Sequence, residues 1–132
     1  MPGRLKIYDG NNFVEIGTLS EKGTKSFTST SVAKEGGAIQ TSESFNNRSW
    51  VRKLKVTPTD GSVNSFVIEF FSDSSFGSDK LEYQATASGT FVDNAGWFHE
   101  DEDNSEELHL KLTNNSLVSS TFTLELTAEV FA

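Results

Sequence analysis

Cysteine is absent from the 132-residue chain, so disulfide bonds, thiolate metal sites and cysteine nucleophiles are all excluded. Basic residues are scarce: 11 Lys and Arg stand against 19 Asp and Glu, which gives a formal net charge of -8. A nucleic-acid partner is not expected, because binding phosphates requires a basic face. No apolar run approaches the roughly 18 residues of a membrane span, and residues 1–5 lack the apolar core of a secretory signal. We therefore expect no membrane partner and synthesis in the cytoplasm.

Phenylalanine is abundant, with 11 copies, whereas methionine occurs once and proline twice. Aromatic residues favour strands, and no segment repeats apolar residues at the helical period over a full helix length. Alternating apolar residues predict strands over 50–57, 81–87, 108–112 and 122–130. The denser apolar run over 63–72 predicts a central strand that is buried on both faces. The expected fold is all-β: a small antiparallel β-sandwich, jelly-roll or barrel-like.

The first third of the sequence has a different pattern. Residues 5–16 predict a hairpin around the turn residues 9–12, because Asp-Gly and Asn accept the positive φ of tight turns. Over residues 17–49 the apolar residues are isolated, so this segment is not expected to build a core of its own. We predict an N-terminal hairpin and extended arm over residues 1–48, followed by the β-sandwich over residues 49–132.

The acidic run over residues 99–107 is the most conspicuous local feature. One interpretation is a calcium site, for which Asp101, Asp103 and Glu106 are weak candidate ligands. The match to a helix-flanked calcium loop is poor, because that loop requires glycine at the position of Glu106. The alternatives are a solvated loop between strands, which is favoured, and an acidic patch that docks on a basic partner. No cofactor is expected.

Two histidines suggest acid–base or metal chemistry. His109 lies between Leu108 and Leu110, so we expect it to point away from the core, towards solvent or a neighbouring subunit. His99 precedes Glu100 and Asp101, and a metal held by these three residues is one hypothesis, although two histidines ten residues apart on separate elements are weak evidence for it. No serine-hydrolase elbow, zinc-protease motif or phosphate-binding glycine loop is present in the sequence. We expect no catalytic residues and no enzymatic activity.

Aromatic side chains outside the clear core pattern are candidate binding residues. A stacking platform for sugar rings would use Trp50, Trp97, Tyr8 and Tyr83. In a small sandwich, such residues more often serve as core or interface anchors. The stacking hypothesis requires that some of Trp50, Trp97 and Tyr83 are solvent-exposed and coplanar.

Two segments resemble parts of tailed-bacteriophage virion structural proteins. Residues 4–17 (RLKIYDGNNFVEIG) are similar to short hairpins of phage fibre and decoration proteins. Residues 101–115, with the later segment 122–126, resemble a recurring β-sandwich module of viral structural proteins. The resemblance implies a non-enzymatic virion protein and transfers no catalytic residue.

Within that class the resemblance favours a capsid decoration, or cement, protein that assembles as a homotrimer and staples neighbouring capsid subunits. The expected location is the virion, and the expected partners are the major capsid protein or other virion subunits. The alternative is a carbohydrate- or receptor-binding module of a tail fibre or tail tip. The residues that we predict to contact a partner are Tyr8, Phe13, Phe27, Ile39, Phe45, Trp50 and Trp97.

Overall fold

The computed structural model describes residues 4–9, 12–18, 23–77, 79–94 and 96–130. It contains eleven β-strands. They are β1 (Arg4–Asp9), β2 (Asn12–Thr18), β3 (Gly23–Thr28), β4 (Gly37–Ser44), β5 (Ser49–Pro58), β6 (Phe66–Phe71), β7 (Leu81–Ala85), β8 (Phe91–Asp93), β9 (Trp97–His99), β10 (Glu107–Asn114) and β11 (Phe122–Val130). The predicted all-β class is therefore confirmed. Within the described ranges, no helix is long and apolar enough to cross a membrane.

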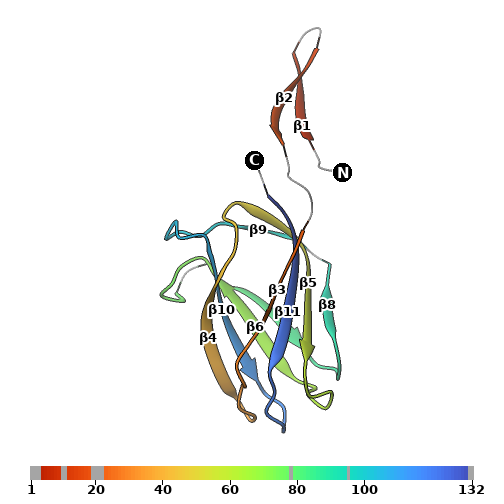
Figure 1. The fold of residues 1–132 in the computed structure, drawn as a ribbon, viewed down its shortest axis with the longest axis vertical. Helices are drawn as coiled ribbons and strands as arrows, with labels where there is room; N and C mark the ends of the chain where they lie inside the picture. Colours follow the sequence, from red (N-terminus) through yellow and green to blue (C-terminus); the bar gives the residue numbers. More distant parts are fainter. Residues whose placement is uncertain (1–3, 10–11, 19–22, 78, 95, 131–132) are drawn as a thin grey trace.

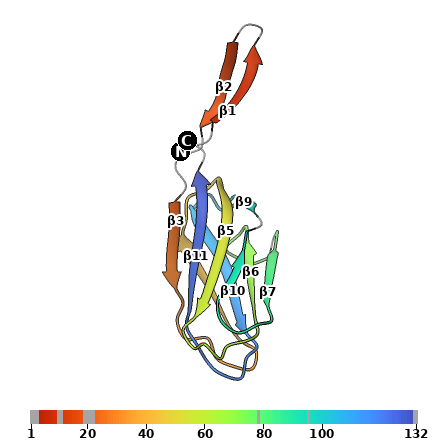
Figure 2. The same cartoon turned by 90° about the vertical axis from the view of Figure 1, so that its right-hand side faces the viewer.

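Nine of these strands form two antiparallel sheets that pack face to face (Figures 1 and 2). One sheet has the order β4-β10-β6-β7, and the other has the order β3-β11-β5-β8, with β9 also paired to β5. The first sandwich strand thus lies beside the last, β4 beside β10, β5 beside β8 and β9, and β6 beside β7. This nested pairing is the topology of a jelly roll.

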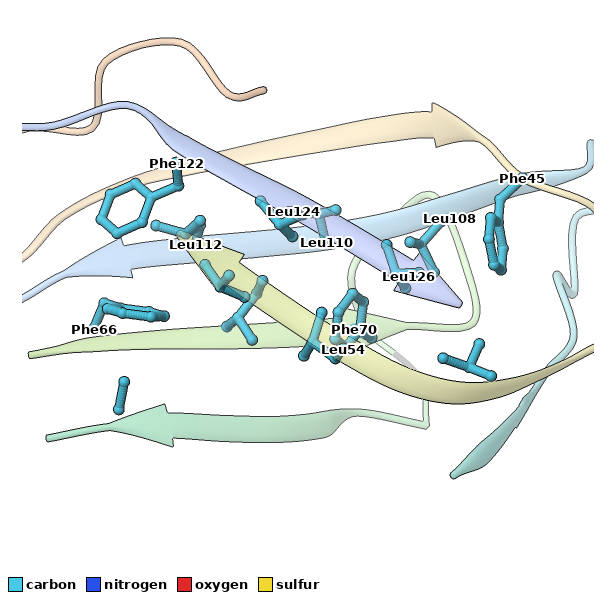
Figure 3. Packing of buried hydrophobic residues seen from close by; sticks show 14 of the residues in the cluster. Phe45, Leu54, Phe66, Phe70, Leu108, Leu110, Leu112, Phe122, Leu124 and Leu126 are labelled. Carbon is cyan, nitrogen blue, oxygen red and sulfur yellow. The ribbon is translucent and has the colours of Figure 1, made fainter. Parts of the chain in front are cut away.

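The core lies between the sheets, where the inward-facing positions of each strand meet (Figure 3). Strand β11 contributes Phe122, Leu124 and Leu126, each fully buried, while the residues between them are partly exposed. Burying one such side chain stabilises the fold by about 1.5–3 kcal/mol relative to leaving it in water. The other large fully buried core side chains are Leu54, Val51, Val32, Phe66, Ile68, Leu108, Leu110 and Leu112.

Strand β6 differs in part from its prediction. Phe66, Ile68 and Phe70 are buried, but Val67 and Glu69 between them are only partly buried. One face of β6 therefore faces the core, and the prediction of a strand buried on both faces is wrong for most of its length. The outer face is closed only at the end of the strand, where Phe71 lies under the ring of Phe76 from the following loop.

The N-terminal hairpin forms as predicted. Strands β1 and β2 pair antiparallel, with Ile7 opposite Val14 and Tyr8 opposite Phe13. Residues 10 and 11 of the predicted turn lie outside the described residues. In both views the hairpin lies beyond one end of the sandwich (Figures 1 and 2), and in the described chain its strands pair only with each other.

The prediction of a hairpin and extended arm over residues 1–48 is wrong from residue 23 onward. Strand β3 pairs with β11, and β4 pairs with β10, so each forms one edge of a sandwich sheet. Val32 and Phe45 from this segment are buried in the core. An edge strand needs few apolar residues, because its backbone hydrogen bonds to the neighbouring strand and one of its faces meets the core.

Candidate functional site

Two loops meet at the end of the sandwich that is nearest the hairpin (Figure 1). One is the acidic loop, residues 100–106, which leads from β9 into β10, and the other is the β6–β7 loop, residues 72–80. Backbone hydrogen bonds join them: the Glu102 N–H donates to the Ser72 carbonyl at 2.8 Å. The Ser74 N–H donates to the Asp103 carboxylate at 2.6 Å. The acidic loop is therefore attached to the sheet.

His109 lies at the centre of this attachment. The alternation of β10 points it away from the core, as predicted, but the side chain is fully buried rather than facing solvent. Its Nε2 lies 3.2 Å from Oδ1 of Asp101, and its Nδ1 lies 2.7 Å from Oγ of Ser42 on β4. Phe76 covers the ring edge-on, with 6.1 Å between the centroids. The alternation of apolar and polar residues in β10 predicts on which face His109 lies, but it does not show that loops cover that face.

Asp101 is the second buried member of the cluster. Its carboxylate accepts hydrogen bonds from the Asp103, Ser105 and Glu107 N–H groups and from the Ser105 hydroxyl, at 2.7–3.2 Å. Burial alone would raise the pKa of Asp101, but these bonds and the one from His109 outweigh it and lower the pKa well below its usual value. Asp101 is thus a buried anion that organises the loop.

The structure brings two of the three candidate metal ligands together. Asp101, Asp103 and His109 each offer a ligand atom within 4.8 Å of the others. Glu106 is not part of this group, and its side chain is exposed. Both oxygens of Asp101 already accept hydrogen bonds from the protein, so a cation would have to compete with them. The geometry indicates a hydrogen-bonded cluster in which Asp101 and His109 attach the acidic loop to the sheet, and calcium binding stays an alternative.

The same contacts create a serine–histidine–aspartate array that the sequence did not indicate. Because the Asp101 carboxylate only accepts, Nε2 of His109 is the donor, and in the neutral ring Nδ1 accepts from the Ser42 hydroxyl. In serine hydrolases the serine is bonded to Nε2 and the aspartate to Nδ1, so the ring here has the opposite orientation. Neither of the pockets that the structure shows at the acidic loop and beside β3 includes Ser42. The array links β4, β10 and the acidic loop.

Beside the Asp101–His109 cluster, a pocket of about 170 Å³ opens between β9 and the opposing sheet. Its apolar lining consists of Phe70, Phe71, Leu81, Trp97, Phe98 and Leu108. Its polar lining consists of Ser72 and Asp79 from the β6–β7 loop, with His99 and Glu100 from the end of β9. The pocket thus combines aromatic rings with carboxylates and one imidazole.

His99 is the unusual group in this pocket. The side chain is 4% exposed, and its Nε2 has no hydrogen-bond partner among the described residues. The ring also bonds to the backbone of Glu107 and packs edge-on against Phe45, with 5.1 Å between centroids. Burial lowers the pKa of His99, which favours the neutral ring. The predicted grouping of His99 with Glu100 and Asp101 at a metal is not formed, since His109 takes the place beside Asp101.

The hypothesis that Trp50, Trp97 and Tyr83 form an exposed, coplanar stacking platform is not supported by the structure. Trp50, Trp97 and Tyr83 are each partly buried rather than exposed. The ring planes of Tyr83 and Trp97 are inclined by 45°, and Trp97 packs on Phe70 with 4.9 Å between centroids. Trp50 lies elsewhere on β5, beneath the guanidinium of Arg52. The rings are used mainly for packing, and only Trp97 contributes to the pocket.

The predicted partner contacts of the arm have other roles. Phe45 is buried in the core, and Phe27 and Ile39 are partly buried and pack against it. They fix β3 and β4 to the sandwich, so they are not free to anchor the chain elsewhere. Tyr8 and Phe13 lie opposite each other in the hairpin register, and their side chains lie outside the described part of the structure.

Comparisons with known proteins do not place the chain in a family. No protein-family model matches it, and no curated protein sequence matches it either. The chain is similar to a solved structure described as the crystal structure of PirA, with 14% sequence identity. The alignment covers 78% of this chain and 92% of that chain, with a TM-score of 0.36. A likeness this weak supports no conclusion about function.

Proposed function

We propose that the protein is a non-enzymatic structural subunit that docks onto neighbouring subunits of a larger assembly through its N-terminal hairpin. A phage capsid is the assembly that the sequence resemblance suggests, with the protein acting as a decoration protein and assembling as a trimer. The hairpin replaces the longer arm in this role, because residues 23–48 belong to the sandwich.

The observation that carries the proposal is the isolated pairing of β1 with β2. In the described residues these strands pair with each other and with no strand of the sandwich. A two-stranded hairpin on its own is marginally stable in water, so an external surface would stabilise it. The register pairs Ile7 with Val14, so these two aliphatic residues lie on the same face of the ribbon. Such an aliphatic face suits a docking element.

The sandwich offers a complementary way to bind. Strands β3, β4, β7, β8 and β9 are the outer strands of the sheets among the described elements. An open edge can accept an additional strand through backbone hydrogen bonds. The hairpin of one subunit could dock on such an edge of a neighbouring subunit, and this contact would join the two subunits without requiring a catalytic site.

The proposal is tested by comparing the full chain with the double variant Ile7→Lys/Val14→Lys in co-sedimentation with empty capsid shells of the parent phage. We expect saturable binding by the full chain and loss of at least about tenfold in affinity for the variant. Lys6→Ser/Glu15→Ser, on the other face, is the matched control and should bind normally. Equal binding of all three chains would contradict the role of the hairpin, and absence of the protein from purified virions by mass spectrometry would contradict the capsid assignment.

A further inference from the structure

We propose that the pocket beside β9 receives the N-terminal hairpin of a second copy of this chain, with strand β1 of that copy adding to the free edge of β7. The inference rests on the proposed function, because it gives the docking hairpin a specific receptor surface. Each copy donates its hairpin to one neighbour and accepts the hairpin of another. A head-to-tail contact of this kind repeats until it closes a ring, and the proposed trimer would be a ring of three.

The first argument is the position of the pocket in the seam between the two sheets. Strand β7 is an edge of its sheet (Figure 2), and among the described strands it pairs only with β6. Along β7 the seam is closed where the ring of Tyr83 packs against Phe91 and Trp97, with 6.2 and 5.7 Å between centroids. At Leu81, where β7 begins, the pocket opens instead. A strand added to this edge would therefore place an inward side chain over the pocket.

The second argument is the size and polarity of the pocket. It measures about 170 Å³, and six of its ten lining residues are aliphatic or aromatic. A cavity of about 150 Å³ accommodates one benzene ring in an engineered protein of another fold. Ile7 and Val14 share one face of the hairpin and together present about as much hydrocarbon as such a ring. Two cross-strand neighbours of a hairpin therefore suit the pocket, whereas a whole strand would not fit inside it.

The third argument is the match between the two strands on their other faces. Successive residues of a strand point to opposite faces, so Lys6 lies on the face of β1 that is opposite to Ile7. On β7, Glu82 is exposed and points away from the core, and it shares the cation of Lys80 with Glu69, at 3.5 and 3.1 Å. Docking that places Ile7 over the pocket places Lys6 on the side of Glu82. These exposed charges favour this orientation over the reversed one, although they add little affinity.

The fourth argument is the hairpin itself. Its pairing passes from Leu5 opposite Gly17 to Lys6 opposite Glu15, so the extra residue is in β2 and β1 is the regular strand. In the described chain neither strand has another partner, and the hairpin lies beyond the end of its own sandwich (Figures 1 and 2). Strand β1 has six residues and β7 has five, so the two edges match in length. A receptor edge on a second copy follows from this placement.

The test measures self-association by sedimentation velocity. A single hairpin contact is a small interface, so we expect weak association that develops between about 5 and 500 µM. Leu81→Lys places a charge at the pocket and should raise the dissociation constant at least about tenfold, as should Ile7→Lys/Val14→Lys in the hairpin. Leu117→Lys is the matched control, because Leu117 is 78% exposed in the β10–β11 loop, and it should associate normally.

Mixing the two defective variants identifies the contact. Leu81→Lys keeps its hairpin, and Ile7→Lys/Val14→Lys keeps its pocket. The mixture should therefore form a one-to-one pair, although neither variant associates alone. A hairpin that folds back on its own sandwich would not give this complementation, and its observation would overturn the inference.

A measurement on the unmodified chain decides the question if Leu81→Lys fails to fold. Amide hydrogen exchange in residues 4–9 and 81–85 should slow together as the concentration rises, while residues 37–44 on the opposite edge should not change. Slowing of residues 37–44 in place of 81–85 would overturn the choice of β7.

The remaining outcomes separate this inference from the proposed function. The inference is overturned if the native chain stays monomeric throughout the concentration range, if folded Leu81→Lys associates as well as its parent, or if the mixture contains no pairs. Capsid binding that depends on the hairpin, without self-association of the native chain, would overturn the inference and leave the proposed function standing. Complementation without capsid binding would support the inference and contradict only the capsid assignment.

Discussion

Replacing Asp101 with asparagine should remove the main source of acid sensitivity in this fold. Oδ1 of Asp101 accepts from the Asp103 N–H and His109, while Oδ2 accepts from Ser105 and the Glu107 N–H. The amide of Asp101→Asn places an NH₂ group where one of these oxygens was, so at least one buried backbone donor and one side-chain donor lose their acceptor. At about 1–3 kcal/mol for each unsatisfied group, we expect the free energy of unfolding to fall by about 2–6 kcal/mol at pH 7.

The lowered pKa of Asp101 determines how the stability difference between the native chain and Asp101→Asn changes with pH. The pKa of Asp101 is lowered in the folded protein, so ionisation stabilises the fold fully above the unfolded-state value near 3.8. That contribution is lost as the pH falls from about 5 towards the folded pKa. The difference between the native chain and Asp101→Asn, measured by urea unfolding, should therefore be largest near pH 7 and shrink below pH 4.

Glu106→Gln is the matched control, because it removes an exposed charge from the same loop and should change stability by less than about 0.5 kcal/mol. The reasoning would be refuted by an Asp101→Asn variant as stable as the native chain at pH 7. It would also be refuted by a stability difference that stays constant between pH 7 and pH 2.

Three further substitutions test the packing at the other end of the sandwich and in the core. Asn114→Ala should cost about 2–4 kcal/mol in urea unfolding, since the fully buried Asn114 amide donates to the Val32 and Val118 carbonyls at 3.1 and 2.8 Å; a loss under 1 kcal/mol would contradict this. Gly37→Ala should cost about 1–3 kcal/mol, because a Cβ there would clash with the carbonyl oxygen of Ala33. Gly61→Ala, where an added Cβ would have nothing within 4 Å, is its control and should be neutral in the same urea unfolding experiments. Leu124→Ala should cost about 2–5 kcal/mol through the cavity that it leaves, and unchanged stability would argue against its central place in the core.

Strands β5, β7, β10 and β11 could be read from the sequence because each buries one face against the core. Strand β11 begins at Phe122 and ends at Val130, as its alternation predicts, and β10 extends the predicted strand by only a few residues. In these strands the residues that alternate between apolar and polar are the same residues that pair with neighbouring strands, so the alternation alone gives the strand and its buried face. Alternation predicted two packed sheets without giving the strand order.

The edge strands and the site could not be read in the same way. In β4 the inward positions include Ile39 and Thr41, and a single aliphatic residue among polar ones gives a weak period. The pairing of His109 with Ser42 joins residues 67 positions apart, so it depends on strand register rather than on local pattern. The burial of residues 37–44 alternates between partly buried and exposed in the structure, but the polar side chains at most of these positions leave no matching hydrophobic alternation in the sequence.

The chain enters the sandwich and leaves it at the same end, on neighbouring antiparallel strands. Gly23 at the start of β3 is paired with Ala128 near the end of β11. A pulling force applied between the hairpin and the C-terminal end of β11 would therefore act across the β3–β11 ladder. It would break the backbone hydrogen bonds one residue pair at a time, instead of loading all of them at once in shear. Tension along that direction would meet little mechanical resistance, and the two strands would separate before the rest of the sandwich yielded.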